Sequence, residues 1–202
     1  MKDQEYRYRA VRARYSESTI TVYQAYSPAI AEAALAAGKF VPPFKRERMT
    51  WIKPSFLWMA YRCGWATKRD QERVLAVEIT REGFEWALEH ACLSHYEPDV
   101  HGSRAAWAEA KKASPVRVQW DPERDLHRRP LNHRSIQIGL GGESVDCYVD
   151  DWTVSITDVT PTMRKTGELV AAGNLEAAEA TLPVEAVYPL PAHIGRPLGA
   201  TG

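Results

Sequence analysis

Residues 19–38, TITVYQAYSPAIAEAALAAG, decide the fold of this chain because they join a strand to a helix with no residue to spare. The β-branched and aromatic residues of the stretch 19–26 favour a strand. Ser27 suits the N-cap of a helix, and Pro28 suits the first helical position. Gly38 suits a left-handed stop. The sequence therefore predicts a strand that turns directly into an alanine-rich helix.

Two polar side chains, Gln24 and Tyr26, fall at the end of this strand, just before the turn. One interpretation is that they satisfy backbone groups at the strand end. The other is that they contact a ligand beyond it. The residues alone leave both interpretations open.

Outward from this stretch, strands and helices follow one another without a strict β-α-β rhythm. Patterning predicts strands at 49–54, 73–80, 114–122, 134–140 and 153–160, and helices at 55–66, 81–91, 104–113, 141–152 and within 161–183. We therefore expect an α+β fold with mixed and antiparallel sheets and flanking helices.

Length and composition limit the organisation of the chain. The 202 residues are 45% apolar and include seven tryptophans, enough to bury one substantial core. We expect a single domain over residues 1–182 and a proline-punctuated tail over 183–202. The N-terminus is charged and no apolar run approaches the roughly 20 residues of a membrane span. These features predict a cytoplasmic protein without a membrane segment.

Cysteine and histidine spacing favours neither disulfides nor a metal. The cysteines Cys63, Cys92 and Cys147 are scattered, which is typical of reduced, buried thiols. His90 and His95 are five residues apart, a spacing that suits neither one helical face nor one strand face. We expect no metal site.

The zero net charge conceals a difference between the two ends of the chain. Residues 1–62 carry 11 Lys/Arg against 5 Asp/Glu, whereas residues 141–202 carry 3 against 9. The two ends could pack against each other or could both be solvated. A third interpretation is an anionic ligand held by the basic part.

The basic segment 44–53 interleaves cations with aromatic residues, a pattern found where proteins bind nucleotides or single-stranded nucleic acid. A solvated basic face is the alternative. The side chains concerned are Phe44, Lys45, Arg46, Arg48, Trp51 and Lys53. A second basic group, Arg128, Arg129, His133 and Arg134, could extend this surface. His133 could also act as an acid or base, although it also fits an ordinary loop histidine.

The order of strand, Tyr23 and Gln24, Ser27, small-residue helix, Gly38 and Phe40 resembles the first motif of the ADP-ribosyltransferase fold. The later strands of 49–54, 73–80 and 114–122 fall in a compatible order, so the resemblance spans about residues 19–140. It implies that NAD is the cofactor.

In that fold a first-strand histidine or arginine grips the adenosine side of NAD, and a serine or threonine holds the nicotinamide half. A late acidic residue contacts the nicotinamide ribose. The resemblance implies Gln24 in the first role, Ser55 in the second, and Gln119, Asp121 or Glu123 in the third. Gln24 has no charge, so phosphate would have to be met by Arg46, Arg48 or Lys53. Gln119 cannot act as a carboxylate.

Longer phrases, FVPPFKRERMTWIKPSFLWMAYRCGWATK and SPVRVQWDPERDL, are similar to the family called domain of unknown function 4291. This resemblance covers most of the chain and brings no activity with it. Function must therefore be argued from the residues.

Three functions from different classes fit these observations. We favour a nucleotide-binding protein, in the form of an ADP-ribosyltransferase-like enzyme that uses NAD. Asp121, Glu123 and His133 are its candidate catalytic residues. The candidate ligand-binding residues are Gln24, Tyr26, Arg46, Arg48, Trp51, Lys53, Ser55, Gln119 and Arg134. The alternatives are a nucleic-acid-binding or RNA-processing module and a non-catalytic interaction protein.

Overall fold

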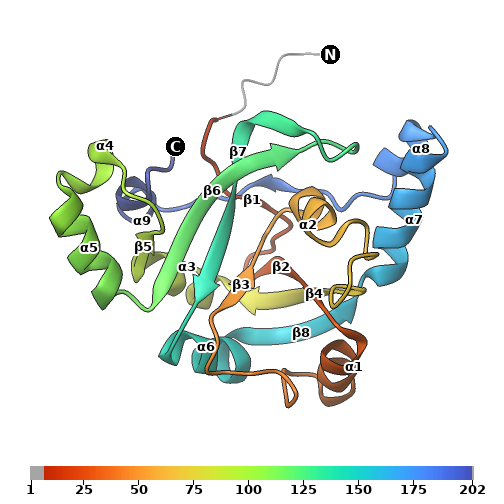
Figure 1. Ribbon diagram of the computed structural model, residues 1–202, viewed down its shortest axis with the longest axis horizontal. Coiled ribbons are helices and arrows are strands. Elements are labelled where there is room, and N and C mark those ends of the chain that lie inside the picture. The colour runs from red at the N-terminus through yellow and green to blue at the C-terminus, as the bar shows by residue number, and fades with distance from the viewer. Residues whose placement is uncertain (1–6, 202) are drawn as a thin grey trace.

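The computed structural model describes residues 7–201 and shows an α+β fold built on two larger sheets, with a small two-stranded sheet beside them (Figure 1). The first sheet has the strand order β2-β4-β8, from Thr19–Tyr26, Arg73–Thr80 and Thr153–Asp158. All of its pairings are antiparallel. β2 is the strand expected from the stretch 19–26.

The second sheet has the order β3-β7-β6-β5. Its strands are β3 (Thr50–Ile52), β7 (Pro130–Leu140), β6 (Val116–Arg124) and β5 (Ala91–Leu93). β5 runs parallel to β6, and the other pairings are antiparallel. The expected mixed and antiparallel sheets are confirmed. β7 begins earlier than patterning indicated, because the polar segment before residue 134 pairs with the end of β6.

The two sheets are joined where β2 passes the end of β3. Tyr23 N–H donates to the carbonyl of Lys53 at 2.7 Å, and Lys53 N–H donates back to the carbonyl of Tyr23 at 3.3 Å. This pair of bonds fixes the position of Lys53 relative to both sheets.

The helices flank the sheets (Figure 1). They are α1 (Pro28–Ala37), α2 (Phe56–Cys63), α3 (Arg81–Glu89), α4 (Pro98–His101), α5 (Arg104–Ala113), α6 (Glu143–Cys147), α7 (Thr160–Ala171), α8 (Leu175–Glu179) and α9 (Ala192–Gly195). A π-helix, η1, follows α6 over Tyr148–Trp152, so the helix expected at 141–152 changes its hydrogen-bond pattern midway. A short 3₁₀ helix, η2, covers Arg196–Leu198.

Helix ends follow local backbone chemistry. Gly38 adopts φ 69°, which confirms the left-handed stop of α1. Ser27 occupies the N-cap position of α1, but its side chain makes no capping hydrogen bond. Ser55 caps α2 fully, because its side chain accepts from the Trp58 N–H at 3.1 Å.

Two apolar cores stabilise the fold. The larger lies between the sheets and includes Ile20, Val22, Val77 and Ile138. The smaller packs α2 and α7 against the first sheet through residues such as Met59. Since Ile20 and Val22 face the larger core, the alternation of β2 turns Gln24 toward the same side.

The C-terminal segment packs into the larger core. Its strand β9 (Ala186–Val187) pairs with β1 (Arg12–Ala13), and Tyr188, Ile194 and Leu198 are buried. Residues 183–201 therefore add to the main body, although their prolines suggested a tail. Within the part of the chain that the structure describes, no helix has both the length and the apolar character to cross a membrane.

Candidate functional site

A cavity of about 580 Å³ lies beside β3 and the C-terminal end of β2. We call it the Lys53 cavity. The loop before β3, helix α2 and the segment around residue 70 form its other walls. Four cationic side chains line it, Lys45, Arg48, Lys53 and Arg62, against the single acidic residue Asp70 among the described wall residues. The excess of positive charge suits an anionic ligand.

Lys53 is the most unusual residue of this wall. It is only 5% exposed, and across residues 7–201 no hydrogen bond or ion pair forms at its Nζ. The amine lies 5.1 Å from the ring centroid of Trp58. Burial and, to a lesser degree, the nearby Arg62 charge lower the pKa of Lys53 to about 7, against the opposing effect of Asp121. Close to neutral pH, a substantial share of the molecules therefore carry a neutral amine here.

Gln24 lines the cavity, but the polar atoms of its amide are already bonded. Its Nε2 donates to Thr50 Oγ1 at 2.8 Å and to the Trp51 carbonyl at 3.1 Å. Its Oε1 accepts from the hydroxyl of Tyr148 at 2.7 Å. Since Gln24 is 3% exposed, these bonds satisfy a buried amide and hold β3 against β2.

Tyr26 joins the cavity to an aromatic cluster with Phe40 and Phe44. The hydroxyl of Tyr26 lies 3.1 Å from Thr50 Oγ1. Burial raises the pKa of Tyr26 above its ordinary value, so its hydroxyl stays protonated. Tyr26, Phe44 and Trp51 give one part of the wall an aromatic surface.

The predicted residues Gln119 and Asp121 do not line the cavity, but both accept a hydrogen bond from a wall residue, Gln137. Gln137 lines the wall, and its Nε2 donates to Gln119 Oε1 at 2.6 Å and to Asp121 Oδ2 at 2.5 Å. Burial raises the pKa of Asp121, while the Gln137 bond and the Lys53 charge oppose that shift. The Asp121 carboxyl thus lies within the electrostatic reach of Lys53.

Ser55 and Glu123 are hydrogen-bonded to each other, and neither side chain reaches the cavity. Ser55 Oγ donates to Glu123 Oε1 at 2.9 Å, and the Arg124 N–H donates to the same oxygen at 2.8 Å. Ser55 is 1% exposed and Glu123 is 7% exposed, and neither lines the Lys53 cavity. The structure separates this pair from the Gln119–Asp121 pair.

Of the three cations expected to bind phosphate, two line the cavity and one does not. Arg48 and Lys53 line the cavity. Arg46 instead forms ion pairs with Asp146 at 2.9 Å and with Asp150 at 2.5 Å, on the far side of the loop before β3. These exposed pairs occupy its guanidinium and hold the loop to α6 and η1.

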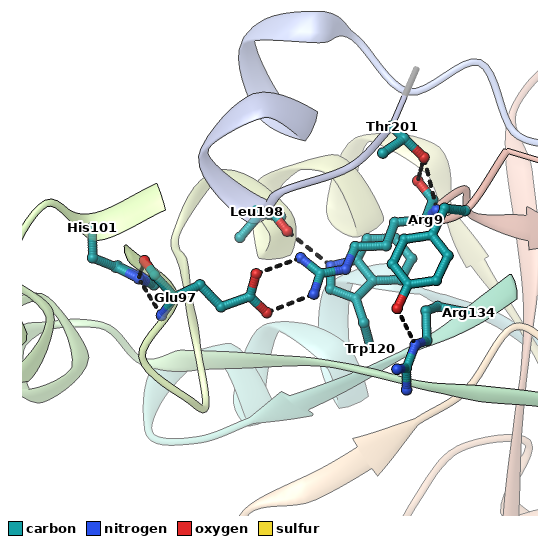
Figure 2. Close-up of polar contacts among 8 residues, drawn as sticks. Arg9, Glu97, His101, Trp120, Arg134, Leu198 and Thr201 are labelled. Carbon is teal, nitrogen blue, oxygen red and sulfur yellow. Dashed lines mark hydrogen bonds and ion pairs between the residues drawn. The ribbon is translucent and has the colours of Figure 1, made fainter. Parts of the chain in front are cut away.

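His133 and Arg134 lie on β7, away from the cavity wall. Arg134 Nε donates to the hydroxyl of Tyr8 at 2.9 Å, beside the ion pair between Arg9 and Glu97 (Figure 2). Burial and the charge of Arg12 lower the pKa of His133. Both residues belong to the region where the two ends of the chain meet.

A second cavity, of about 1020 Å³, lies in that same region, between β1 and the C-terminal segment. Its wall includes Arg9, whose two terminal nitrogens are bound to Glu97 at 2.6 Å, and Glu185. None of the predicted site residues lines it. We therefore take the Lys53 cavity as the candidate site.

Sequence reasoning missed Arg62 and Gln137 as wall residues. Arg62 stands in the last turn of α2, a helix that reads as apolar nearly all round. Gln137 faces Gln119 across the β6–β7 pairing, between the buried residues Ile136 and Ile138. A polar residue in an apolar strand was the available signal for Gln137.

A comparison with protein families finds a match over residues 10–188, and the matching family is described as Domain of unknown function (DUF4291). The matched region includes both sheets and every wall residue of the Lys53 cavity. A comparison with curated proteins finds no match.

Proposed function

We propose a nucleotide-binding function for this chain, which belongs to the family described as Domain of unknown function (DUF4291). The Lys53 cavity is the binding site, and the ligand is a nucleotide or an NAD-like phosphate ester. One observation carries the proposal: a buried lysine without a hydrogen-bond acceptor lines a cavity whose charge is mostly positive.

Phosphate is the anion that best fits these cations. Arg48 and Arg62 are exposed at the cavity and can donate paired hydrogen bonds to phosphate oxygens. A buried amine without an acceptor is costly, and a phosphate oxygen would supply the acceptor that Lys53 lacks. A phosphate dianion would also favour the charged form of Lys53.

The aromatic part of the wall suits a planar base. Phe44 is 8% exposed and Trp51 is half-buried, so both keep fixed positions beside the cations. Stacking of a base on an aromatic side chain contributes about 1–3 kcal/mol. Adjacent aromatic and cationic surfaces match the two halves of a nucleotide.

The residues present fit the NAD roles of the ADP-ribosyltransferase resemblance only in part. The side-chain amide of Gln24 is already hydrogen-bonded to Thr50, Trp51 and Tyr148. Ser55 is hydrogen-bonded to Glu123 outside the cavity wall. The proposal therefore ends at nucleotide binding and derives no transfer step. NAD remains one of the ligands to be tested.

A nucleic-acid surface receives less support. That alternative needs a continuous basic face through Arg46, Arg48, Arg128 and Arg129. Arg46 is paired with Asp146 and Asp150, and Arg129 is paired with Asp125. Lys45, Arg48, Lys53 and Arg62 instead line a cavity.

A thermal-shift screen with NAD, ADP-ribose, ATP and a short RNA tests the proposal. A ligand at 100 times its dissociation constant should raise the free energy of unfolding by about 2.7 kcal/mol. Arg48→Met should weaken the response, because Arg48 lines the cavity. Arg104→Met is the matched control, since Arg104 is an exposed residue of α5 and lies outside the wall. A flat screen, or equal losses in both variants, would reject the proposal.

A further inference from the structure

Lys53 differs from every other lysine at the described positions, because it alone is buried. Its backbone is fixed by the paired hydrogen bonds with Tyr23, and its side chain passes Trp58 to reach the cavity wall. A structural lysine in such a position normally ends on a carboxylate or a carbonyl. No such partner is within bonding distance of its Nζ anywhere in residues 7–201.

The groups that face this amine come from several elements. Arg62 and the Trp58 ring lie on α2, Asp121 lies on β6, and Gln137 lies on β7. The Asp121 carboxylate is shared with Gln137, and the positive charge of Arg62 disfavours the ammonium form of Lys53. Burial acts in the same direction as Arg62, and the result is a pKa of about 7. A buried lysine beside another cation is a recognised arrangement for an amine nucleophile.

We propose that Lys53 is an amine nucleophile that condenses with the aldehyde of a phosphate-bearing substrate held in the Lys53 cavity. This inference rests on the proposed function, because Arg48 and Arg62 must bind the phosphate for the aldehyde to reach Lys53. It adds to that function a covalent step and a substrate class.

The reaction balances without an oxidant or reductant. The lone pair of the neutral Nζ attacks the carbonyl carbon, and a proton moves from nitrogen to the former carbonyl oxygen to give a carbinolamine. That intermediate loses its hydroxyl and a second nitrogen-bound proton as water. The products are a Lys53 imine and one molecule of water.

Phosphorylated aldoses belong to this substrate class. ADP-ribose is one example, since it carries a diphosphate, an adenine base and a terminal ribose that opens to an aldehyde. Its phosphates match Arg48 and Arg62, and its base matches the aromatic wall at Trp51. Its aldehyde is the group that Lys53 can capture.

Pyridoxal 5′-phosphate is a suitable probe, because it combines an aldehyde, a phosphate and an aromatic ring. The full chain is incubated with substoichiometric probe near neutral pH, reduced with borohydride and mapped by peptide mass spectrometry. An ordinary exposed lysine has a pKa of about 10.4, so at pH 7 its amine is neutral in only roughly one molecule in two thousand. Lys53 should therefore be labelled at least about tenfold faster than the exposed Lys165.

Two controls identify the site. Lys53→Met should abolish the preferred label, whereas Lys165→Met should leave it unchanged. Pyridoxine 5′-phosphate, which has an alcohol in place of the aldehyde, should compete with labelling of Lys53 and form no adduct. Competition in the unaltered protein decides the question even where Lys53→Met fails to fold.

The outcomes separate this inference from the proposed function. If pyridoxine 5′-phosphate or a nucleotide stabilises the protein but Lys53 is labelled no faster than Lys165, the imine chemistry is refuted and phosphate binding stands. If no phosphate compound stabilises the protein or competes with labelling, the binding proposal fails and this inference fails with it.

Discussion

Replacing Lys53 with Met should change how stability depends on pH, and the structure sets the size of the effect. Burial lowers the pKa of Lys53 from 10.5 to about 7 in the folded protein. Between these two values the unfolded chain binds more protons than the folded chain, so the free energy of unfolding rises with pH. At 1.36 kcal/mol per pKa unit, Lys53 costs at most about 5 kcal/mol below pH 7, and the cost disappears towards pH 10.5.

Methionine removes this titration and keeps most of the side-chain volume. The Lys53→Met protein should therefore be more stable than the unaltered protein at about pH 6, and the difference should shrink by several kcal/mol towards pH 10. Urea denaturation at a series of pH values measures the difference directly. Lys165→Met, at an exposed position of α7, is the matched control for the loss of one lysine. Parallel curves for Lys53→Met and the unaltered protein would show that Lys53 is an ordinary ammonium group, and the reasoning would be refuted.

Three further changes test other parts of the structure. Gly83→Ala should destabilise the fold by about 1–3 kcal/mol in urea denaturation, because the new Cβ would lie 2.3 Å from Cγ of Trp152; a neutral result would mean that the ring can shift. Tyr148→Phe should cost about 1–3 kcal/mol by the same assay, since it removes the donor to Gln24 Oε1, and a loss of only a few tenths would mean that water replaces the bond. Burial raises the pKa of Glu185 from 4.5 to about 8, so its contribution to stability is full below pH 4.5 and is lost as pH rises towards 8. The stability of the Glu185→Gln protein should not fall between pH 4.5 and 8, which thermal unfolding at a series of pH values would measure. The same fall in the variant as in the unaltered protein would contradict this prediction.

Local rules predicted the elements around the opening stretch well. The strand, the turn at Ser27 and Pro28, and the stop at Gly38 depend on backbone preferences that neighbouring residues determine. The same is true of Ser55, whose cap on α2 is a contact between residues three apart. The α+β class followed from the order of such elements.

Partners distant in the chain could not be predicted in this way. The bond between Gln24 and Tyr148 joins residues 124 apart, and the one between Ser55 and Glu123 joins residues 68 apart. The residues next to each partner in the sequence give no indication of which distant residue it will bond to. The prolines of the last twenty residues likewise indicate interrupted secondary structure, whereas the burial of Tyr188 and Leu198 depends on the distant strand β1.

For the candidate site, the sequence indicates which residue types gather there, but not how they are arranged. The interleaved cations and aromatic residues before Lys53 do form a cavity wall, but Arg46 turns away to Asp150 because a carboxylate lies across the loop. The acidic candidates also split. Asp121 and Glu123 are two residues apart and would share one face of a regular strand, but β6 carries an irregularity between Pro122 and Arg124. Asp121 accepts a hydrogen bond from the wall residue Gln137, and Glu123 accepts one from Ser55, which lies outside the wall.

The place of Lys53 in the fold explains why a costly amine is tolerated there. Its backbone completes the junction between the two sheets by bonding to Tyr23, and any residue except proline could make that pair of bonds. The junction therefore does not need a lysine side chain, and an apolar side chain would fill the space beside Trp58 at a lower cost. A group that destabilises the fold, is not required by the backbone and opens on a cationic cavity is best explained by what enters that cavity. Gln24 serves the opposite purpose, because its bonds to Thr50, Trp51 and Tyr148 hold β3 in place and so fix the direction from which Lys53 meets a ligand.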